Sequence, residues 1–291
     1  MVAWWDSREV GQAMRTKEIV DLVLRDHRIN CRRSINSTIS HSRPLLQYLP
    51  AKRITTEDIE AYKQLRICEH NRMPGTVRNE LTILKRGYTL AKEQGRLNGH
   101  EPKIKFPQVH NTRSIISTVE QVQTIIKVLR GICPALADLV LWMCLTGWRR
   151  GECADFTWTM VSQDRYKVEL PPSKTKNLML KTVQVGQQAK EILDRRWEDR
   201  YREYVFHRGG KRLYHYRGPW MRAIIAADIS ELRPHDLRRF FATQGTQAGV
   251  PQKTLMSIGG WKTTSTFDRY CIINSQMQSE AQDRIAEAIS Q

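Results

Sequence analysis

PHDLRRFFAT, residues 234–243, is the stretch from which the rest of the chain can be interpreted. It places His235 and Arg238 three residues apart, so a helix here would carry both side chains on one face. Histidine exchanges a proton near neutral pH. Arginine is a permanent cation whose planar fork fits phosphate oxygens. The pair therefore indicates a site that binds an anionic group and handles a proton.

The charge balance favours a polyanionic partner. The 291 residues include 47 lysines and arginines against 30 aspartates and glutamates, which gives a net charge of +17. Such an excess favours nucleic acid first and an anionic membrane surface second. The six cysteines form no C-x-x-C pair and no secretory signal is present, so they are expected to be reduced thiols.

No apolar run approaches the roughly 20 residues that a membrane span requires. We therefore expect a cytoplasmic protein without a membrane partner, associated with the nucleoid when it is bound to double-stranded DNA. The eight histidines form no H-x-x-x-H or H-x-E pattern, so no metal site is expected.

Hydrophobic periodicity predicts a mainly α-helical chain of two domains. The first domain, residues 1–98, is expected to be a helical DNA-binding domain, and its clearest helix covers residues 76–94. The basic side chains of that helix either contact DNA phosphates or form an ordinary solvated surface; they include Arg78, Lys85 and Arg86.

Other signals place the remaining elements of the first half. Helices are expected from Thr16, over residues 34–48, and after an N-cap at Thr55 or Thr56. Pro74-Gly75 is expected to be a break. From residue 99 to 115 the periodicity is lost and prolines interrupt the chain, which indicates an interdomain linker.

The second domain, residues 116–291, is expected to be mainly helical with a small β-sheet. Residues 166–170 and 181–185 read as two short strands, separated by PPSKTKN at residues 171–177. Helices are expected after the cap Thr118 and over residues 134–145, 188–204, 218–227, 234–246, 251–258 and 277–289.

Transfer of a phosphodiester needs a nucleophile, cations on the non-bridging oxygens, and a proton for the leaving 5′ oxygen. Tyr270, at the end of STFDRY, is a fair nucleophile because its pKa near 10 makes it a better leaving group later than serine. Arg238 and Arg149, the latter in TGWRRGE at residues 146–152, could grip one DNA phosphate from two sides. His235 could accept the tyrosine proton.

A lysine could supply the proton to the leaving oxygen. Lys174 is the first candidate, Lys176 is an alternative, and Lys181 lies close to both in sequence.

In order and spacing, these motifs resemble the catalytic domain of the tyrosine recombinase, or phage integrase, family. TGWRRGE is similar to the family's T-G-x-R-x-x-E segment, and HDLR to its H-x-L-R box. GWKT at residues 260–263, followed by DRY at 268–270, resembles the final box, and SKTK at 173–176 resembles the β-hairpin lysine segment. The likeness covers about residues 116–275, and the helical first half resembles the core-binding domain far less specifically.

The resemblance implies a role for each motif residue. Arg149 and Arg238 hold the scissile phosphate and Tyr270 forms a 3′-phosphotyrosyl bond. Lys174 protonates the leaving hydroxyl and His235 assists proton transfer. Glu152 orients the site without reacting. Trp261 stands where many members have histidine, and an indole can donate to a phosphate but cannot shuttle protons.

Arg239 also stands where a histidine is common, which is expected to be a structural variation.

As a whole, the resemblance implies a site-specific recombinase of the kind found in mobile elements. It would cleave and rejoin double-stranded DNA at a specific site as a two-domain clamp, in tetramers on paired sites, with accessory DNA-bending proteins as further partners. No nucleotide cofactor is expected, because the phosphotyrosine conserves the bond energy. Two alternatives are a type IB topoisomerase, which shares the chemistry and relaxes supercoils, and a non-catalytic DNA-binding protein on the same fold.

The C-terminal helix expected over residues 277–289 carries an apolar face of Ala281, Ile285 and Ile289. This face either packs on its own domain or docks on a neighbouring protomer, as similar terminal segments do in the family.

Overall fold

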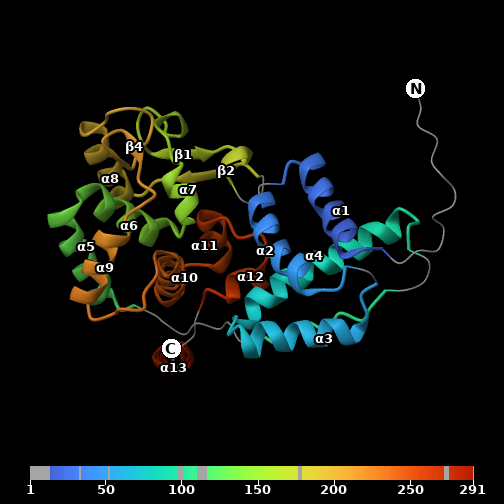
Figure 1. Ribbon diagram of the computed structural model, residues 1–291. Coiled ribbons are helices and arrows are strands. Elements are labelled where there is room, and N and C mark those ends of the chain that lie inside the picture. The colour runs from blue at the N-terminus through green and yellow to red at the C-terminus, as the bar shows by residue number, and fades with distance from the viewer. Residues whose placement is uncertain are drawn as a thin grey trace. The chain divides into compact units, whose positions relative to one another are not determined.

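The computed structural model describes residues 14–32, 34–51, 53–97, 101–109, 117–175, 179–271 and 275–290. They form a mainly helical structure with two short antiparallel sheets (Figure 1). The predicted fold class, mainly α with a small β-sheet, is therefore confirmed. The chain divides into two compact units, Met1–Asn111 and Thr112–Gln291.

The first unit is a helical cluster around its own apolar core. Its elements are α1 (Thr16–Ile29), α2 (Ile35–Tyr48), α3 (Thr56–Gln64), the π-helical turn η2 (Leu65–Glu69) and α4 (Pro74–Glu93). The apolar stripe of α4 packs against α1 and α2, and Val77, Leu81 and Leu84 are fully buried there. Thr55 caps α3 by accepting a hydrogen bond from the backbone N–H of Asp58 at 3.1 Å.

The predicted break at Pro74 and Gly75 is wrong. Both residues belong to the first turn of α4, and Met73 is its N-cap. Proline suits this position because the N–H that it lacks would have no intrahelical partner there, and its fixed φ matches the helix. The proline therefore begins the helix.

Part of the predicted linker lies against the first unit. Residues 101–109 are described, and they contain no helix or strand. The backbone N–H of Lys103 donates to Thr56 Oγ1 at 3.0 Å, and Phe106 packs against the apolar core of that unit.

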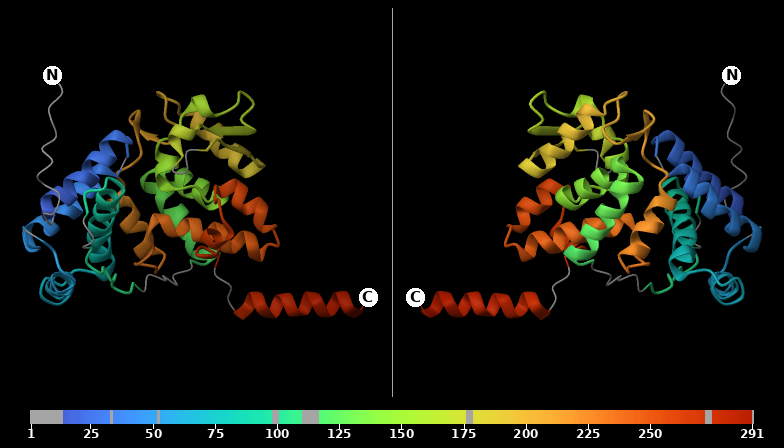
Figure 2. Two further views of the ribbon diagram at one scale, coloured as in Figure 1. Left: turned by 90° about the vertical axis from the view of Figure 1, so that its right-hand side faces the viewer. Right: turned by 90° about the vertical axis from the view of Figure 1, so that its left-hand side faces the viewer.

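The second unit is built around a buried central helix. Its larger helices are α5 (Val119–Ile132), α6 (Pro134–Thr146), α8 (Gln187–Glu198), α9 (Arg217–Ala226), α10 (Leu237–Gln247), α11 (Gln252–Gly259) and α13 (Ser275–Ser290). Its short helical elements are α7 (Arg150–Ala154), α12 (Thr264–Asp268), η3 (Trp158–Met160), η4 (Pro172–Lys174) and η5 (Pro234–Asp236). Helix α6 is almost entirely apolar, and it packs against α5, α8 and α10. Figure 2 shows the ribbon from two further sides.

Two strands predicted from the sequence form a hairpin. They are β1 (Lys167–Leu170) and β2 (Lys181–Gln184), paired antiparallel with Leu170 opposite Lys181 and Val168 opposite Val183. Successive strand residues point to opposite faces. Lys181 and Val183 therefore share one face, and both are buried.

The helix predicted over residues 188–204 is too long. Helix α8 ends at Glu198, because the chain beyond it pairs with residues that follow α7. The backbone N–H of Trp158 donates to the carbonyl of Glu203 at 2.9 Å, and Val205 donates to Phe156 at 3.0 Å. A second hairpin that the sequence did not predict follows, formed by β3 (His207–Arg208) and β4 (Lys211–Arg212).

Candidate active site

The end of α6 places Arg149. Gly147 ends the helix in the left-handed region, at φ 60°, and a Cβ on it would lie 2.4 Å from the Phe241 ring. Trp148 is fully buried, and its indole N–H donates to the carbonyl of Ile258 at 3.1 Å. Arg149 follows as the N-cap of α7, with 22% of its side chain exposed.

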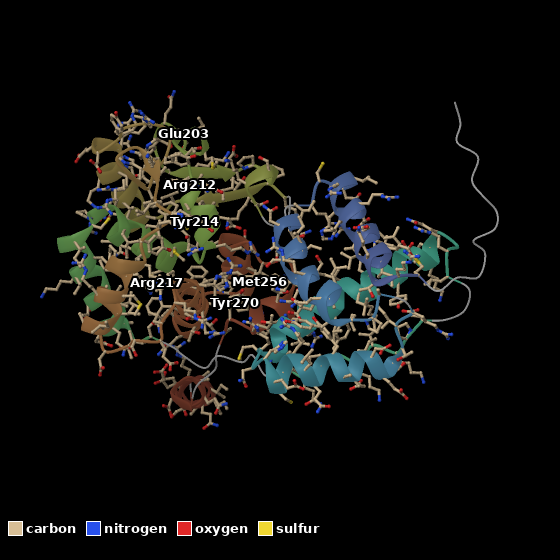
Figure 3. The ribbon with its side chains drawn as sticks, viewed as in Figure 1. Glu203, Arg212, Tyr214, Arg217, Met256 and Tyr270 are labelled. Carbon is tan, nitrogen blue, oxygen red and sulfur yellow. The ribbon has the colours of Figure 1, made fainter. Side chains whose placement is uncertain are left out.

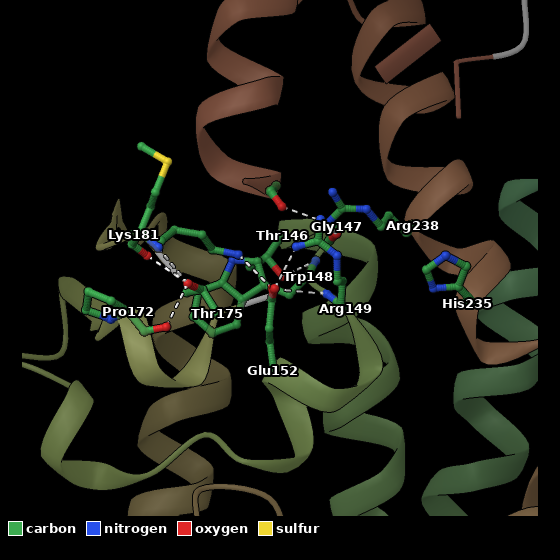
Figure 4. Close-up of polar contacts among 12 residues, drawn as sticks. Thr146, Gly147, Trp148, Arg149, Glu152, Pro172, Thr175, Lys181, His235 and Arg238 are labelled. Carbon is green, nitrogen blue, oxygen red and sulfur yellow. Dashed lines mark hydrogen bonds and ion pairs between the residues drawn. The ribbon is translucent and has the colours of Figure 1, made fainter. Parts of the chain in front are cut away.

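A buried carboxylate joins two cations at this point. Glu152 Oε1 accepts from Arg149 Nη1 at 2.7 Å, and Glu152 Oε2 accepts from Lys181 Nζ at 3.0 Å (Figure 4). Burial raises the pKa of Glu152, but the charges and hydrogen bonds of Lys181 and Arg149 outweigh burial and hold that pKa below its usual value. The carboxylate is therefore ionised at neutral pH and orients both cations.

Arg238, in the first turn of α10, is fully buried. Its Nη1 donates to the carbonyls of Gly147 and, at 2.7 Å, Gly259. Its Cζ lies 3.5 Å from the centroid of the Trp261 ring. Burial, followed by the charge of Arg149, lowers the pKa of Arg238 to about 10, so the side chain remains a cation at neutral pH.

Three buried donors around Arg238 have no protein acceptor in the described part of the chain. They are Arg238 Nε, Arg238 Nη2 and Trp261 Nε1. An unsatisfied buried donor costs about 1–3 kcal/mol, and more when it is charged. Donors left in this way on a fixed guanidinium and its neighbouring indole are suited to an anion with several oxygens.

Tyr270 lies beside Arg238. Its hydroxyl is hydrogen-bonded to His235 Nε2 at 3.1 Å, and its ring centroid lies 5.3 Å from Arg238 Cζ. Tyr270 follows α12 and packs, with Met256 of α11, against a small core that includes Trp261 (Figure 3). The predicted nucleophile and the predicted proton acceptor are thus in direct contact within one chain.

The electrostatic surroundings of His235 favour its neutral form. The residue as a whole is exposed, but partial desolvation of its ring, followed by the charge of Arg238, lowers its pKa below the ordinary 6.5. Asp236 opposes this shift, and Arg149 and Arg239 add to it. A neutral imidazole can accept a proton from a hydroxyl at neutral pH.

The first candidate proton donor, Lys174, and its neighbour in sequence, Lys181, do not share one location. Lys174 is exposed at the end of η4 and lines a surface hollow with Pro171 and Glu203, whereas Arg149 lines another. Lys176 lies outside the described residues. Lys181 lines the same hollow as Arg149, and sequence reasoning named it only as a neighbour of Lys174. The missed signal was strand alternation, which puts Lys181 in phase with the apolar Val183.

That hollow measures about 310 Å³ and opens next to the phosphate-binding candidates. Its polar lining includes Arg149, Lys181 and Lys262, and Trp261 and Met256 form part of its apolar wall.

The three basic residues predicted to bind DNA lie on α4 of the first unit. Arg78 and Lys85 are exposed. Arg78 Cζ and Lys85 Nζ each lie 5.4 Å from the centroid of the Phe106 ring. Arg86 is partly buried and forms ion pairs with Asp26 at 3.6 Å and Glu93 at 3.5 Å. All three have intramolecular contacts, and their role toward DNA stays a prediction.

The described residues contain neither a candidate membrane span nor a candidate metal site. Among these residues, no helix combines the length and apolar character needed to cross a bilayer. The same part of the chain contains no cluster of three or more histidine, cysteine, aspartate or glutamate side chains placed to bind a metal ion.

The sequence of this chain is similar to those of known proteins. The family model described as "Phage integrase family" matches residues 116–277, more than half of the chain. The integrase of Salmonella phage P22 is 25% identical over 208 residues, which are 67% of this chain and 53% of the phage protein. An integrase of Saccharopolyspora erythraea is 25% identical over 117 residues, 39% of this chain and 26% of that protein. The chain thus spans about half or less of the length of these curated relatives.

Solved structures share the fold. A lambda integrase tetramer bound to a Holliday junction matches with a TM-score of 0.69 and 17% identity, over 91% of this chain and 79% of that chain. The Tn1549 transposon integrase in complex with circular intermediate DNA matches with a TM-score of 0.69 and 15% identity, over 93% and 99% of the two chains.

Proposed function

The chain belongs to the phage integrase family, and from this membership and the site geometry we propose that it is a site-specific tyrosine recombinase. It would cleave and rejoin double-stranded DNA through a 3′-phosphotyrosine intermediate. The observation that carries the proposal is the meeting of Tyr270, His235 and Arg238: a hydroxyl hydrogen-bonded to an imidazole, beside a buried guanidinium with two unsatisfied donors.

The proposed cleavage step assigns each atom a task. Tyr270 Oη attacks phosphorus while His235 Nε2 accepts its proton. Arg149 and Arg238 donate to the non-bridging oxygens, whose charge grows in the transition state, and Trp261 Nε1 adds one donor. The bond from phosphorus to the 5′ oxygen breaks as that oxygen takes a proton from a lysine, for which Lys174 and Lys176 remain the predicted donors.

Rejoining reverses these steps with a 5′ hydroxyl from the same or another strand. The phosphotyrosine ester keeps the energy of the broken phosphodiester, so the proposed reaction consumes no nucleotide cofactor. A recombinase is preferred over a type IB topoisomerase because the family match and the curated relatives are integrases. It is preferred over a non-catalytic DNA-binding protein because every residue type that the chemistry needs is present.

The proposal extends to domains and partners. Residues 1–98 are proposed to be the core-binding domain, 99–115 the linker and 116–291 the catalytic domain, which together act as a clamp on duplex DNA. Arg78, Lys85 and Arg86 are proposed phosphate contacts. A tetramer on paired sites is supported by the lambda integrase tetramer bound to a Holliday junction, which has the same fold.

A nicked suicide substrate tests the nucleophile. The wild type should form a covalent protein–DNA adduct, because loss of a short nicked strand prevents rejoining. Tyr270→Phe should still bind DNA and form no adduct, since it removes only the attacking oxygen. Tyr201→Phe is the control, because Tyr201 is 60% exposed and lies against Gly210 and Arg202, which are not part of the candidate site.

An undiminished adduct in Tyr270→Phe would refute the assignment of the nucleophile. Exchange between two sites, measured beside relaxation of supercoiled DNA, separates a recombinase from a topoisomerase.

A further inference from the structure

Lys181 lies buried at the centre of the candidate active site. Its side chain is only 8% exposed, and its Nζ lies 4.4 Å from the centroid of the Trp148 ring. Lysines are almost never buried to this extent unless they are paired. The partner is Glu152, whose Oε2 accepts from Lys181 Nζ at 3.0 Å.

Glu152 connects Lys181 to Arg149. Its other oxygen, Oε1, accepts from Arg149 Nη1 at 2.7 Å, and Oε2 also accepts from the backbone N–H of Arg149 at 3.3 Å. A carboxylate is planar, so a cation that fixes one oxygen also fixes the direction of the other. Lys181 therefore limits the rotation of the Glu152 carboxylate, to which Arg149 donates its hydrogen bonds (Figure 4).

Lys181 also contacts the segment that carries Trp261. A Cβ on Gly260 would lie 3.0 Å from Lys181 Cδ and 3.4 Å from its Nζ. Gly260 is the left-handed C-cap of α11, with φ 72°, and directly precedes Trp261. From β2, the Lys181 side chain thus reaches the segment of Trp148 and Glu152 on one side and Gly260 on the other.

The ion pair is charged at neutral pH. Burial lowers the pKa of Lys181 to about 8, and Glu152 opposes this shift. The pKa of Glu152 is held below its usual value despite burial. At neutral pH both groups are therefore mainly in their charged forms.

We propose that Lys181 is a positioning residue that acts through Glu152 to fix the direction in which Arg149 presents its guanidinium to the scissile phosphate. The inference rests on the proposed function. It gives Lys181 no part in proton transfer, because its ammonium is engaged by Glu152 and the Trp148 ring.

A double-mutant cycle tests the link to Arg149. Lys181→Met keeps an unbranched side chain and removes the charge. It should slow adduct formation on the suicide substrate by about 10²-fold, as expected for a reacting group displaced by ~1 Å, with DNA binding nearly unchanged. In an Arg149→Ala background the same change should alter the rate by less than about 3-fold, because effects that act through one partner do not add. Equal losses in both backgrounds would overturn the proposal.

Two modified substrates separate positioning from other roles. A methylphosphonate at the scissile position carries less charge and needs less cationic stabilisation. The rate losses caused by Lys181→Met and by Arg149→Ala should therefore both be smaller on the methylphosphonate substrate. A 5′-bridging sulfur leaves without a proton, and it should not rescue Lys181→Met. Rescue by sulfur would make Lys181 the proton donor and overturn the positioning role.

Lys190→Met is the matched control. Lys190 also pairs with a carboxylate, Asp194 Oδ2 at 2.8 Å, but it does not line the hollow beside Arg149. Its rate should stay within about 2-fold of wild type, as for most surface substitutions. Thermal melting reports folding, and if Lys181→Met fails to fold, Lys181→Gln repeats the cycle with a polar side chain.

Titration of Glu152 in the DNA-free protein gives a result that does not depend on cleavage. Lys181→Met should raise the Glu152 pKa, measured by ¹³C NMR of labelled carboxyl groups, since the charge of Arg149 remains but that of Lys181 is lost. Glu152→Gln identifies the resonance, and Lys190→Met should leave it unchanged. An unaltered Glu152 pKa in Lys181→Met would overturn the link, even if the wild type proved unable to cleave DNA.

Discussion

Arg238 is a buried cation whose hydrogen-bond acceptors, among the residues that the structure describes, are carbonyls and not carboxylates. Two main-chain carbonyls accept from one of its nitrogens, and the Trp261 ring lies against its face at 3.5 Å from Cζ. An unpaired buried charge is costly. The fold tolerates this one because carbonyl dipoles and a π face partly replace water. An anion that accepts hydrogen bonds from the remaining donors would offset this cost. The arrangement of Arg238 therefore suits an anion-bound state better than an empty one.

His235 leads to a prediction about pH. If its neutral imidazole accepts the proton of Tyr270, cleavage should be lost as the pH falls through the His235 pKa, which is lowered below 6.5. Between that pKa and about pH 8, where Lys181 begins to lose its charge, the imidazole is neutral and the rate should be level. His235→Gln should be slower by about 10²–10⁴-fold and should lack this acidic limb, since glutamine does not titrate.

Single-turnover adduct formation across pH, with DNA binding measured at each point, provides the check. A His235→Gln enzyme that kept the same acidic limb would show that another group titrates.

At the scale of elements, the site depends on how α6 ends. Gly147 allows the left-handed turn, makes room for the Phe241 ring, and presents the carbonyl to which Arg238 donates. One residue therefore sets the exit of α6, the approach of α10 and the position of Arg238. Arg149 lies two residues further on, so both predicted clamp residues depend on this turn.

Gly147→Ala should destabilise the protein by about 2 kcal/mol or more, because it adds left-handed strain and a clash with Phe241. Gly131→Ala, near the end of α5, is the control. Its added methyl would meet nothing within 4 Å, and it should be neutral or stabilising by about 0.5–1 kcal/mol. Chemical denaturation of both variants measures these changes. A denaturation midpoint of Gly147→Ala equal to that of the wild type would show that the turn can relax.

At the scale of the whole molecule, the net charge of +17 favours a polyanionic partner, and the exposed face of α13 bears on the predicted assembly. Ala281, Ile285 and Ile289 are all exposed on α13, and Ile285 and Ile289 are 59% and 80% accessible. The alternative in which this face packs on its own domain is therefore not seen in the described residues. Docking on a second copy of the chain stays a prediction.

Removal of residues 277–291 should leave binding to a half-site nearly intact and should weaken cooperative binding to two half-sites and strand exchange. Ile285→Asp should act likewise, because it would place a charge in an apolar contact. Gel shifts on one and two half-sites, with Glu287→Gln as an exposed control and melting curves for folding, measure the effect. Strand exchange at the wild-type rate in the truncated protein would show that α13 does not control assembly.

Periodicity and caps were sufficient for most elements, because they depend on neighbours a few residues apart. The stripe on α4, the Thr118 cap of α5, the apolar α6 and the β1–β2 hairpin are where the sequence predicts them. The motif residues Arg149, His235, Arg238 and Tyr270 were also recognisable from residue type, order and spacing.

The error at Pro74 was local, because a proline that can interrupt a helix can also begin one. The other errors and omissions arise where distant segments meet. Helix α8 stops early because its continuation pairs with residues 156–158, a competition that no local pattern contains. The acceptors of Arg238 are carbonyls that lie 91 and 21 residues away in sequence, and Glu152 meets Lys181 across 29. Side-chain type predicts what a residue can do, but packing of the chain determines which groups it meets. Strand alternation could have marked Lys181 as buried, but only the folded chain shows that it pairs with Glu152 beside Arg149.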